Sequence, residues 1–313
     1  MLMEIAMGLQ HKPKSPEQIA AAISLYDRAL GICPAEERLL RARITARKGT
    51  ALQALPGDGA EGNAALEAAR EAHESALLVL REAGRAEETA EVEMNLGLVI
   101  QSLAGAGRAR ITDAIAAYQR ALRTFDRAGF PREFAILQSN LATAFLSMPF
   151  TDSRGKMREA LAVAAFEEGL QVVNLIDHPA EYAMLQNNLG NALQYASSSH
   201  AVENNLRALE AYDEALKVCT REAMPLEYAN TISNRANCLW NLPDDAAAPE
   251  LGNRKNQLAA KAAYSEARAI FAAHGEHQKA RIAGEACEQI DREMLSQAVA
   301  GPPSHSNGHG SST

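Results

Sequence analysis

The residues of this chain that could do chemistry fall into a few short clusters, and none of them has the spacing of a known active site. His73 directly precedes Glu74, and Glu276 lies between His274 and His277. A zinc-dependent hydrolase needs His-Glu-x-x-His on one helix, so that both imidazoles reach the metal and the glutamate acts as the base. Neither cluster has that spacing, and we expect no metal site.

The glycines and the acidic pairs do not form a phosphate or acid–base site either. The glycine pairs at 57/59 and 105/107 are not followed by the Lys-Ser/Thr of a phosphate-binding loop. Adjacent carboxylates such as Glu87 and Glu88 fall on predicted helices, where they are solvated charge. We therefore predict that the protein is not an enzyme and has no cofactor.

Composition and charge argue against further classes of function. The 313 residues carry a formal net charge of −8, whereas a nucleic-acid surface needs basic patches. No apolar run is long enough to cross a bilayer, and the N-terminus lacks the basic start of a signal peptide. The cysteines, at 33, 219, 238 and 287, show no Cys-x-x-Cys spacing and should be reduced thiols. We expect a cytoplasmic protein without membrane insertion or nucleic-acid partners.

One short phrase recurs along the chain, and an asparagine is its most regular polar residue. Its four copies are Met94-Asn95-Leu96-Gly97, Ser139-Asn140-Leu141-Ala142, Asn187-Asn188-Leu189-Gly190 and Ser233-Asn234-Arg235-Ala236. From 95 to 140, 188 and 234 the steps are 45, 48 and 46 residues. A repeat in this range is typical of an array of one supersecondary unit rather than of a globule with a single core.

Each repeated unit is predicted to contain two helices. In the first, apolar residues such as Leu96, Val99, Ile100 and Leu103 follow the i, i+3, i+4, i+7 spacing of an amphipathic helix. Prolines at 131, 179 and 225 precede three of these helices, at positions where a missing N–H costs nothing. The second helix carries a ring between two small residues, at Tyr26, His73, Tyr118, Phe166, Tyr212 and Tyr264. We interpret His73 as a packing residue of this series.

These residues resemble the tetratricopeptide repeat (TPR), whose first helix has a Leu-Gly/Ala pair and whose second helix has an alanine and an aromatic residue. The resemblance implies an all-α fold, a right-handed solenoid of helix pairs with five to six repeats. The period is longer than the usual 34 or so residues of the family. It is similar to the variants of kinesin light chains and of bacterial multi-repeat TPR proteins. Arg235 replaces the leucine in one copy, and Arg47-Lys48-Gly49 matches the phrase only weakly.

The expected organisation is one solenoid over residues 1–298 followed by a disordered tail at 299–313. The predicted units are about 1–37, 38–84, 85–130, 131–178, 179–224 and 225–275, with a capping helix at 276–292. The tail is rich in glycine, proline and serine and cannot bury apolar area.

The asparagines of the repeated phrase form the best-defined candidate binding site in the sequence. Each lies at the edge of the apolar stripe, and its amide offers two donors and an acceptor, which suits the backbone of an extended peptide. The resemblance implies the same role, because related TPR proteins hold peptide backbone there. Alternatively, each asparagine ties adjacent helices together. The predicted peptide-binding residues are Asn95, Asn140, Asn188, Asn234, Asn187, Asn191, Asn230, Asn237, Gln53, Gln101, Gln194 and Trp240.

Trp240, the only tryptophan, falls on the polar side of its helix, which predicts an exposed anchor for a partner. Two functions are consistent with these features. The first is a protein-binding adaptor, scaffold or assembly and maturation chaperone that holds an extended peptide in its concave groove. The second is a regulatory, peptide-sensing or self-associating structural protein. A homo-oligomer is consistent with this second function. The sequence does not identify the protein or peptide partner.

Overall fold

The computed structural model describes residues 1–11, 13–57, 59–149, 155–196 and 200–300, except for the side chains of 297–300. All regular elements of these residues are helices. They are α1 (Leu2–His11), α2 (Pro16–Ile32), α3 (Arg38–Gln53), α4 (Gly59–Ala83), α5 (Ala86–Gly105), α6 (Ile111–Ala121), α7 (Pro131–Leu146), α8 (Gly155–Leu170), α9 (Pro179–Gln194), α10 (Ala201–Leu216), α11 (Pro225–Trp240), η1 (Pro249–Leu251), α12 (Arg254–Ala273) and α13 (His277–Ala300).

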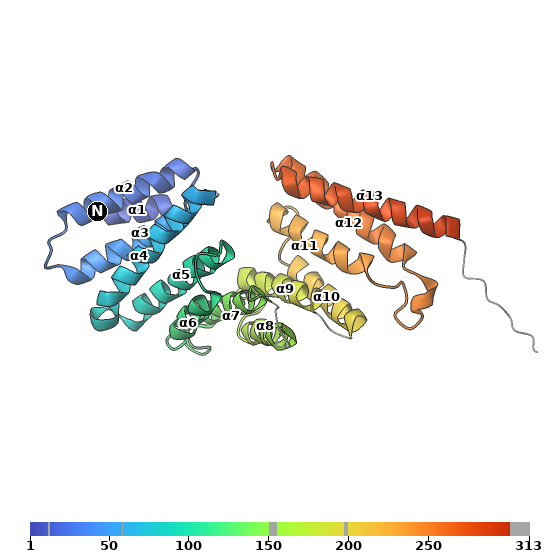
Figure 1. Cartoon of the computed structure of the whole chain (residues 1–313), viewed down its shortest axis with the longest axis horizontal. Helices are drawn as coiled ribbons and strands as arrows, with labels where there is room; N and C mark the ends of the chain where they lie inside the picture. Colours follow the sequence, from blue (N-terminus) through green and yellow to red (C-terminus); the bar gives the residue numbers. More distant parts are fainter. Residues whose placement is uncertain (12, 58, 150–154, 197–199, 301–313) are drawn as a thin grey trace, which may run out of the picture. The chain divides into compact units, whose positions relative to one another are not determined.

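The chain forms two compact units, Met1–Leu185 (unit 1) and Gln186–Thr313 (unit 2). In unit 1 each helix from α1 to α8 packs on the next one along the chain, both within pairs and between them (Figure 1). The first helices of successive pairs also touch, α1 with α3, α3 with α5 and α5 with α7. In unit 2, α10 packs on α11, α11 on α12 and α12 on α13. Contacts between sequence neighbours are what a repeat array is built from.

In three helix pairs, a ring on the second helix fills the space of a missing side chain on the first. A Cβ added to Gly97 on α5 would lie 2.4 Å from Cε1 of Tyr118 on α6, which is closer than atoms can approach. Gly190 on α9 has the same relation to Tyr212 on α10, with a distance of 2.6 Å. Both rings are fully buried. The glycine of the repeated phrase is therefore required by the aromatic residue that follows it in the chain.

The hydroxyl groups of these tyrosines donate to amides on the first helix of the same pair. Tyr118 donates to Oε1 of Gln101 at 2.8 Å, and Tyr212 donates to Oε1 of Gln194 at 2.9 Å. Tyr26 donates in the same way to Gln10 at 2.8 Å. A buried phenol needs such a partner. Burial also raises the pKa of Tyr118 and Tyr212 above the ordinary tyrosine value, so both remain neutral donors.

His73 occupies the ring position of the α3–α4 pair, as the sequence predicts. It is fully buried, and a Cβ added to Gly49 would lie 2.9 Å from its Cε1 atom. Both ring nitrogens are buried without a hydrogen-bond partner among the described residues. Burial lowers the pKa of His73 from 6.5 to about 4, because the charged imidazolium would lose its hydration.

The two basic residues that break the repeated phrase have a common structural reason. Lys48 and Arg235 stand where other copies have leucine. Lys48 Nζ contacts Asp27 at 2.5 Å, and Arg235 Nε contacts Asp213 at 2.7 Å. Each aspartate directly follows the tyrosine of the preceding second helix, Tyr26 or Tyr212 in the two cases. The departure from the motif therefore comes with a compensating acid one helix earlier.

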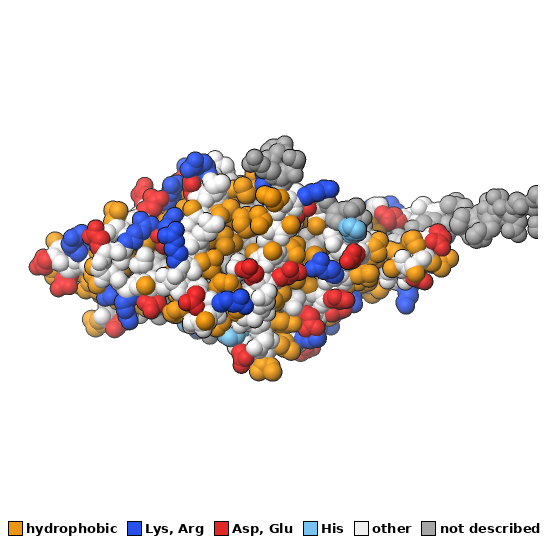
Figure 2. Space-filling model, turned by 90° about the horizontal axis from the view of Figure 1, so that it is seen from below, with side chains coloured by type: hydrophobic (Ala, Val, Ile, Leu, Met, Phe, Trp, Pro, Cys, Tyr) orange, Lys and Arg blue, Asp and Glu red, His pale blue; other side chains and the backbone are white. Residues whose placement is uncertain are grey.

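The surface carries exposed apolar side chains among charged ones. Leu78, Met157 and Leu206 on α4, α8 and α10 are 69%, 61% and 42% exposed. Figure 2 shows one face on which hydrophobic side chains lie between acidic and basic ones. Because charges of both signs are mixed there, this face exerts little long-range attraction on a partner of either sign.

The predicted capping helix at 276–292 corresponds to α13, which is longer and ends at Ala300. The predicted tail lies outside the described residues from Gly301 onward. Among the described helices, none is long and apolar enough to span a membrane.

The packing of Gly97 on Tyr118 predicts a steric penalty for any larger residue. Gly97→Ala should lower the free energy of unfolding by roughly 1–3 kcal/mol, because the added methyl overlaps the ring. Gly105→Ala is the matched control on the same helix, because nothing lies within 4 Å of its added Cβ. Alanine should be neutral or slightly stabilising there. Urea unfolding measures both variants, and equal stabilities would show that the ring does not occupy the space at Gly97.

The buried His73 predicts a loss of stability in mild acid. The unfolded chain binds a proton at this residue below about pH 6.5, whereas the folded chain does so only near pH 4. The stability contributed by neutral His73 is complete above pH 6.5 and is lost as the pH falls to about 4, on the order of 3 kcal/mol in all. His73→Phe should flatten the pH dependence of unfolding between pH 6.5 and 5. His277→Gln, at an exposed position, should leave it unchanged, and equal slopes in all three proteins would contradict this account.

Candidate functional site

Two rows of asparagines face each other in unit 2. Asn230, Asn234 and Asn237 on α11 are spaced i, i+4, i+7 and so lie on one face of that helix. Asn234 Nδ2 donates to Oδ1 of Asn187 on α9 at 3.3 Å. Asn237 Nδ2 donates to the hydroxyl of Tyr195, just after α9, at 2.8 Å. These side chains form one surface, which we call the amide face.

The amide face carries no charged side chain between the two rows. The α9 sequence from Tyr182 to Gln194 contains no acidic or basic residue. On α11, Arg235 adjoins the row and its guanidinium is held by Asp213 on α10. Glu227, one turn before Asn230, carries a charge at the end of the same helix face. All five predicted asparagines of this surface, at 187, 191, 230, 234 and 237, are partly buried, as is Asn188 beside them. The surface therefore offers neutral donors and acceptors within reach of solvent.

Some predicted binding residues already serve the helix pairs. Asn191 Oδ1 and Gln194 Oε1 both accept from the hydroxyl of Tyr212, at 2.8 and 2.9 Å. Gln101 accepts from Tyr118 in the same way. The sequence analysis predicted that these amides bind a ligand. In the structure, their carbonyl oxygens accept hydrogen bonds from tyrosine hydroxyls of the same helix pair. Gln53, at the end of α3, is partly buried.

The asparagines of unit 1 lie at the same kind of position, between first helices of neighbouring pairs. Asn95 Nδ2 donates to Thr50 Oγ1 on α3 at 3.4 Å, a long bond. Asn140 Nδ2 on α7 is buried and has no partner among the described residues. Together with the Asn187–Asn234 bond, the Asn95–Thr50 bond supports the alternative in which the asparagines connect successive helices. Peptide binding by the same amides stays a prediction.

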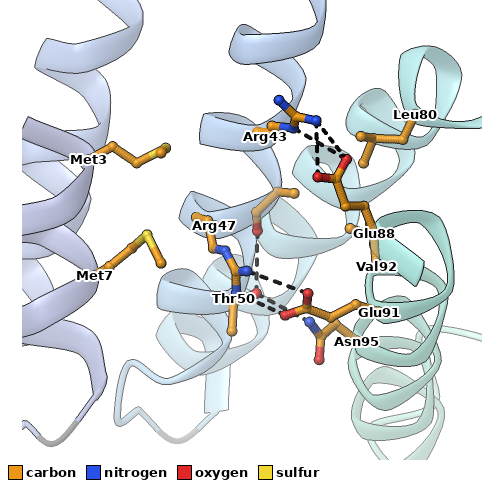
Figure 3. A pocket seen from close by; sticks show the side chains of 11 residues that line it. Met3, Met7, Arg43, Arg47, Thr50, Leu80, Glu88, Glu91, Val92 and Asn95 are labelled. Carbon is orange, nitrogen blue, oxygen red and sulfur yellow. Dashed lines mark hydrogen bonds and ion pairs between the residues drawn. The ribbon is translucent and has the colours of Figure 1, made fainter. Parts of the chain in front are cut away.

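Unit 1 also contains a hollow of about 150 Å³ that the sequence did not indicate (Figure 3). Three neighbouring first helices, α1, α3 and α5, supply most of its walls, with Leu80 of α4 at one side. Two ion pairs cross from α3 to α5, Arg43 to Glu88 at 3.0 Å and Arg47 to Glu91 at 2.8 Å. The partners are 45 and 44 residues apart, which is the repeat step, and that spacing was a usable signal in the sequence.

Trp240 is less exposed than the sequence predicted, and its role in binding a partner stays a prediction. Its side chain is partly buried, and its indole N–H donates to Glu293 Oε2 on α13 at 2.8 Å. Its ring meets that of Tyr264 edge to face, with 6.5 Å between centroids. Ile290 of α13 belongs to the same apolar cluster. Trp240 therefore holds the last helix against α11 and α12.

Metal binding and thiol reactivity were the two kinds of chemistry to look for among the described residues. No group of three or more His, Cys, Asp or Glu side chains among them could hold a metal ion. Burial raises the pKa of the Cys238 thiol to about 12, and it also raises those of Cys219 and Cys287. A thiol with a raised pKa is a poor nucleophile at neutral pH, because little thiolate is present.

No protein-family model matches the sequence, and no curated protein matches it. Among solved structures, the apo form of RapI is similar, with a TM-score of 0.51 and 12% identity over 95% of this chain and 98% of that chain. A Rap protein complexed with competence and sporulation factor matches with a TM-score of 0.46 and 12% identity, over 94% of this chain and 75% of that one. The likeness to RapI shows the fold alone. It confirms the expected fold class, an all-α TPR-type array of helix pairs.

The contacts of Trp240 predict a structural role that a stability measurement can detect. Trp240→Ala should lower the free energy of unfolding by roughly 2–4 kcal/mol, because it removes an aromatic side chain packed against α12 and α13. Tyr195→Ala is the matched control in the same unit, since Tyr195 is 69% exposed. Tyr195→Ala should lower the free energy of unfolding much less in the same urea titration. A Trp240 variant as stable as the parent would contradict this structural role.

Proposed function

We propose that this chain is a non-enzymatic protein–protein interaction module that binds an extended, uncharged peptide segment on the amide face of unit 2. The observation that carries the proposal is the pair of facing asparagine rows on α9 and α11, which are partly buried and free of charge. An adaptor, a scaffold and an assembly or maturation chaperone would all use such a surface.

The chemistry of the amide group supports this function. An asparagine side chain offers two N–H donors and one carbonyl acceptor, and it can therefore match either polar group of a peptide backbone. An extended segment exposes both groups at every residue, so rows of amides hold it whatever its side chains are. Asn230 and Asn237 are two turns apart on α11, a rise of roughly 10 Å, which matches backbone groups about three residues apart in an extended segment.

We also propose that the helix pairs are repeats of the long-period TPR variant, with the unit boundaries given above. The recurrence of the Asn-Leu-Gly/Ala phrase at steps of 45, 48 and 46 residues supports this assignment.

The proposal is tested by purifying the full chain from its native cell and identifying the protein that co-elutes. A triple variant, Asn230→Ala, Asn234→Ala and Asn237→Ala, should then bind that protein at least tenfold more weakly, because each lost hydrogen bond contributes roughly 0.5–1.5 kcal/mol. The matched control is Asn204→Ala with Gln278→Ala, on α10 and α13 away from the amide face. It should bind like the parent.

Equal binding by the parent and the triple variant, with both proteins folded by circular dichroism, would rule out the amide face as the binding site. A short signal peptide as the co-eluting species would favour the regulatory alternative. Recovery of a second copy of the chain alone would favour self-association.

A further inference from the structure

The hollow of unit 1 is built from three short rows of side chains, each with the spacing of one helical turn (Figure 3). Met3 and Met7 of α1 form one wall. Arg43, Arg47 and Thr50 follow along α3, and Glu88, Glu91 and Asn95 follow along α5. Figure 3 shows the arginines of α3 directed toward the glutamates of α5, with the methionines on the opposite side of the hollow.

The charged residues of the hollow neutralise one another. Arg43 pairs with Glu88 and Arg47 with Glu91, so two cations meet two anions. An anionic or cationic ligand would have to displace an existing partner and would gain little. The remaining contact surface comes from Met3, Met7, Ala46, Leu80 and Val92, which are apolar. The hollow therefore favours an uncharged, apolar group.

Size and adaptability restrict that group further. The hollow has a volume of about 150 Å³, which is the size of an apolar cavity that accepts benzene in another protein. Methionine side chains are unbranched and polarisable, and they adjust to groups of different shape. Met7 is 37% exposed, so a ligand would cover a side chain that is now in contact with water.

We propose that this hollow is a pocket for one large apolar side chain, of leucine or phenylalanine, from an uncharged peptide segment. The side chain packs between Met3, Met7 and Val92. Asn95, at the end of the pocket, donates to Thr50 through its amide nitrogen only. Its carbonyl oxygen accepts no hydrogen bond from the described residues and is available to a backbone N–H of the same segment. The inference rests on the proposed function in that the chain binds a peptide, but it uses a different unit and different residues.

The test uses the full chain labelled with ¹³C at the methionine methyl groups and titrated with N-acetyl-phenylalanine amide and N-acetyl-leucine amide. The signals of Met3 and Met7, identified by Met3→Leu and Met7→Leu, should shift and saturate. The signal of Met157, an exposed methionine on α8, should not move. N-acetyl-glutamic acid amide should shift none of the three. Shifts that do not saturate, or that are equal at Met157, would overturn the proposal.

A second measurement uses variants that keep the fold. Met7→Gln should weaken binding of N-acetyl-phenylalanine amide on the order of tenfold, because a polar amide replaces the apolar wall. Met7→Leu should retain binding, and Met157→Gln should leave it unchanged. Unaltered binding in Met7→Gln would overturn the proposal.

The two proposals fail separately. If the pocket binds no probe while the triple asparagine variant still loses its partner, the pocket inference is wrong and the function on the amide face stands. If the pocket binds its probes while the asparagine variant keeps its partner, the proposal for the amide face is wrong and the pocket inference is retained.

Discussion

The structure depends on one steric relation, the fit of a ring on the second helix into the space of a missing side chain on the first. Where Tyr118 or Tyr212 projects, a Cβ on Gly97 or Gly190 would overlap it. This fit sets the separation of the two helices of a pair, and it buries a phenol that must then find a hydrogen-bond partner. Gln101 and Gln194, near the end of the first helix, accept that hydrogen bond. One packing constraint thus determines a glycine and an amide on the first helix and an aromatic residue on the second.

The sequence predicted the parts of the fold that are periodic. The ring series from Tyr26 to Tyr264 and the Leu-Gly/Ala pairs recur at similar steps, so each copy supports the others. The pairing of Lys48 with Asp27 and of Arg235 with Asp213 was present in the sequence but could not be recognised, because it requires knowing which faces of neighbouring helices meet. The same limit applies to Gln101 and Gln194: their spacing placed them on one surface but did not show that a tyrosine hydroxyl reaches them first.

The errors and omissions concern the ends of the array, where the repeat no longer predicts the neighbours. The polar side of α11 at Trp240 was expected to face solvent, but α13 lies there and supplies Glu293 and Ile290. At the other end, α1 places Met3 and Met7 opposite the ion pairs of α3 and α5, and Asn95 is the one lining residue that the four copies of the phrase marked. A terminal helix has a partner on one side only, so its contacts depend on its own sequence rather than on the pattern.

The ion pairs between neighbouring first helices make the helix pairs non-interchangeable. Arg43 and Arg47 on α3 match Glu88 and Glu91 on α5, whereas α9 and α11 meet through Asn187 and Asn234. If α5 and α6 were removed and the chain rejoined, α3 would face α7, where the positions one repeat step further on hold Glu133 and Ile136 rather than two glutamates. One arginine would then lie against an aliphatic side chain. The contact surfaces of the pairs therefore specify their order. A shortened or shuffled array would assemble with mismatched neighbours even where a ring still fitted its glycine.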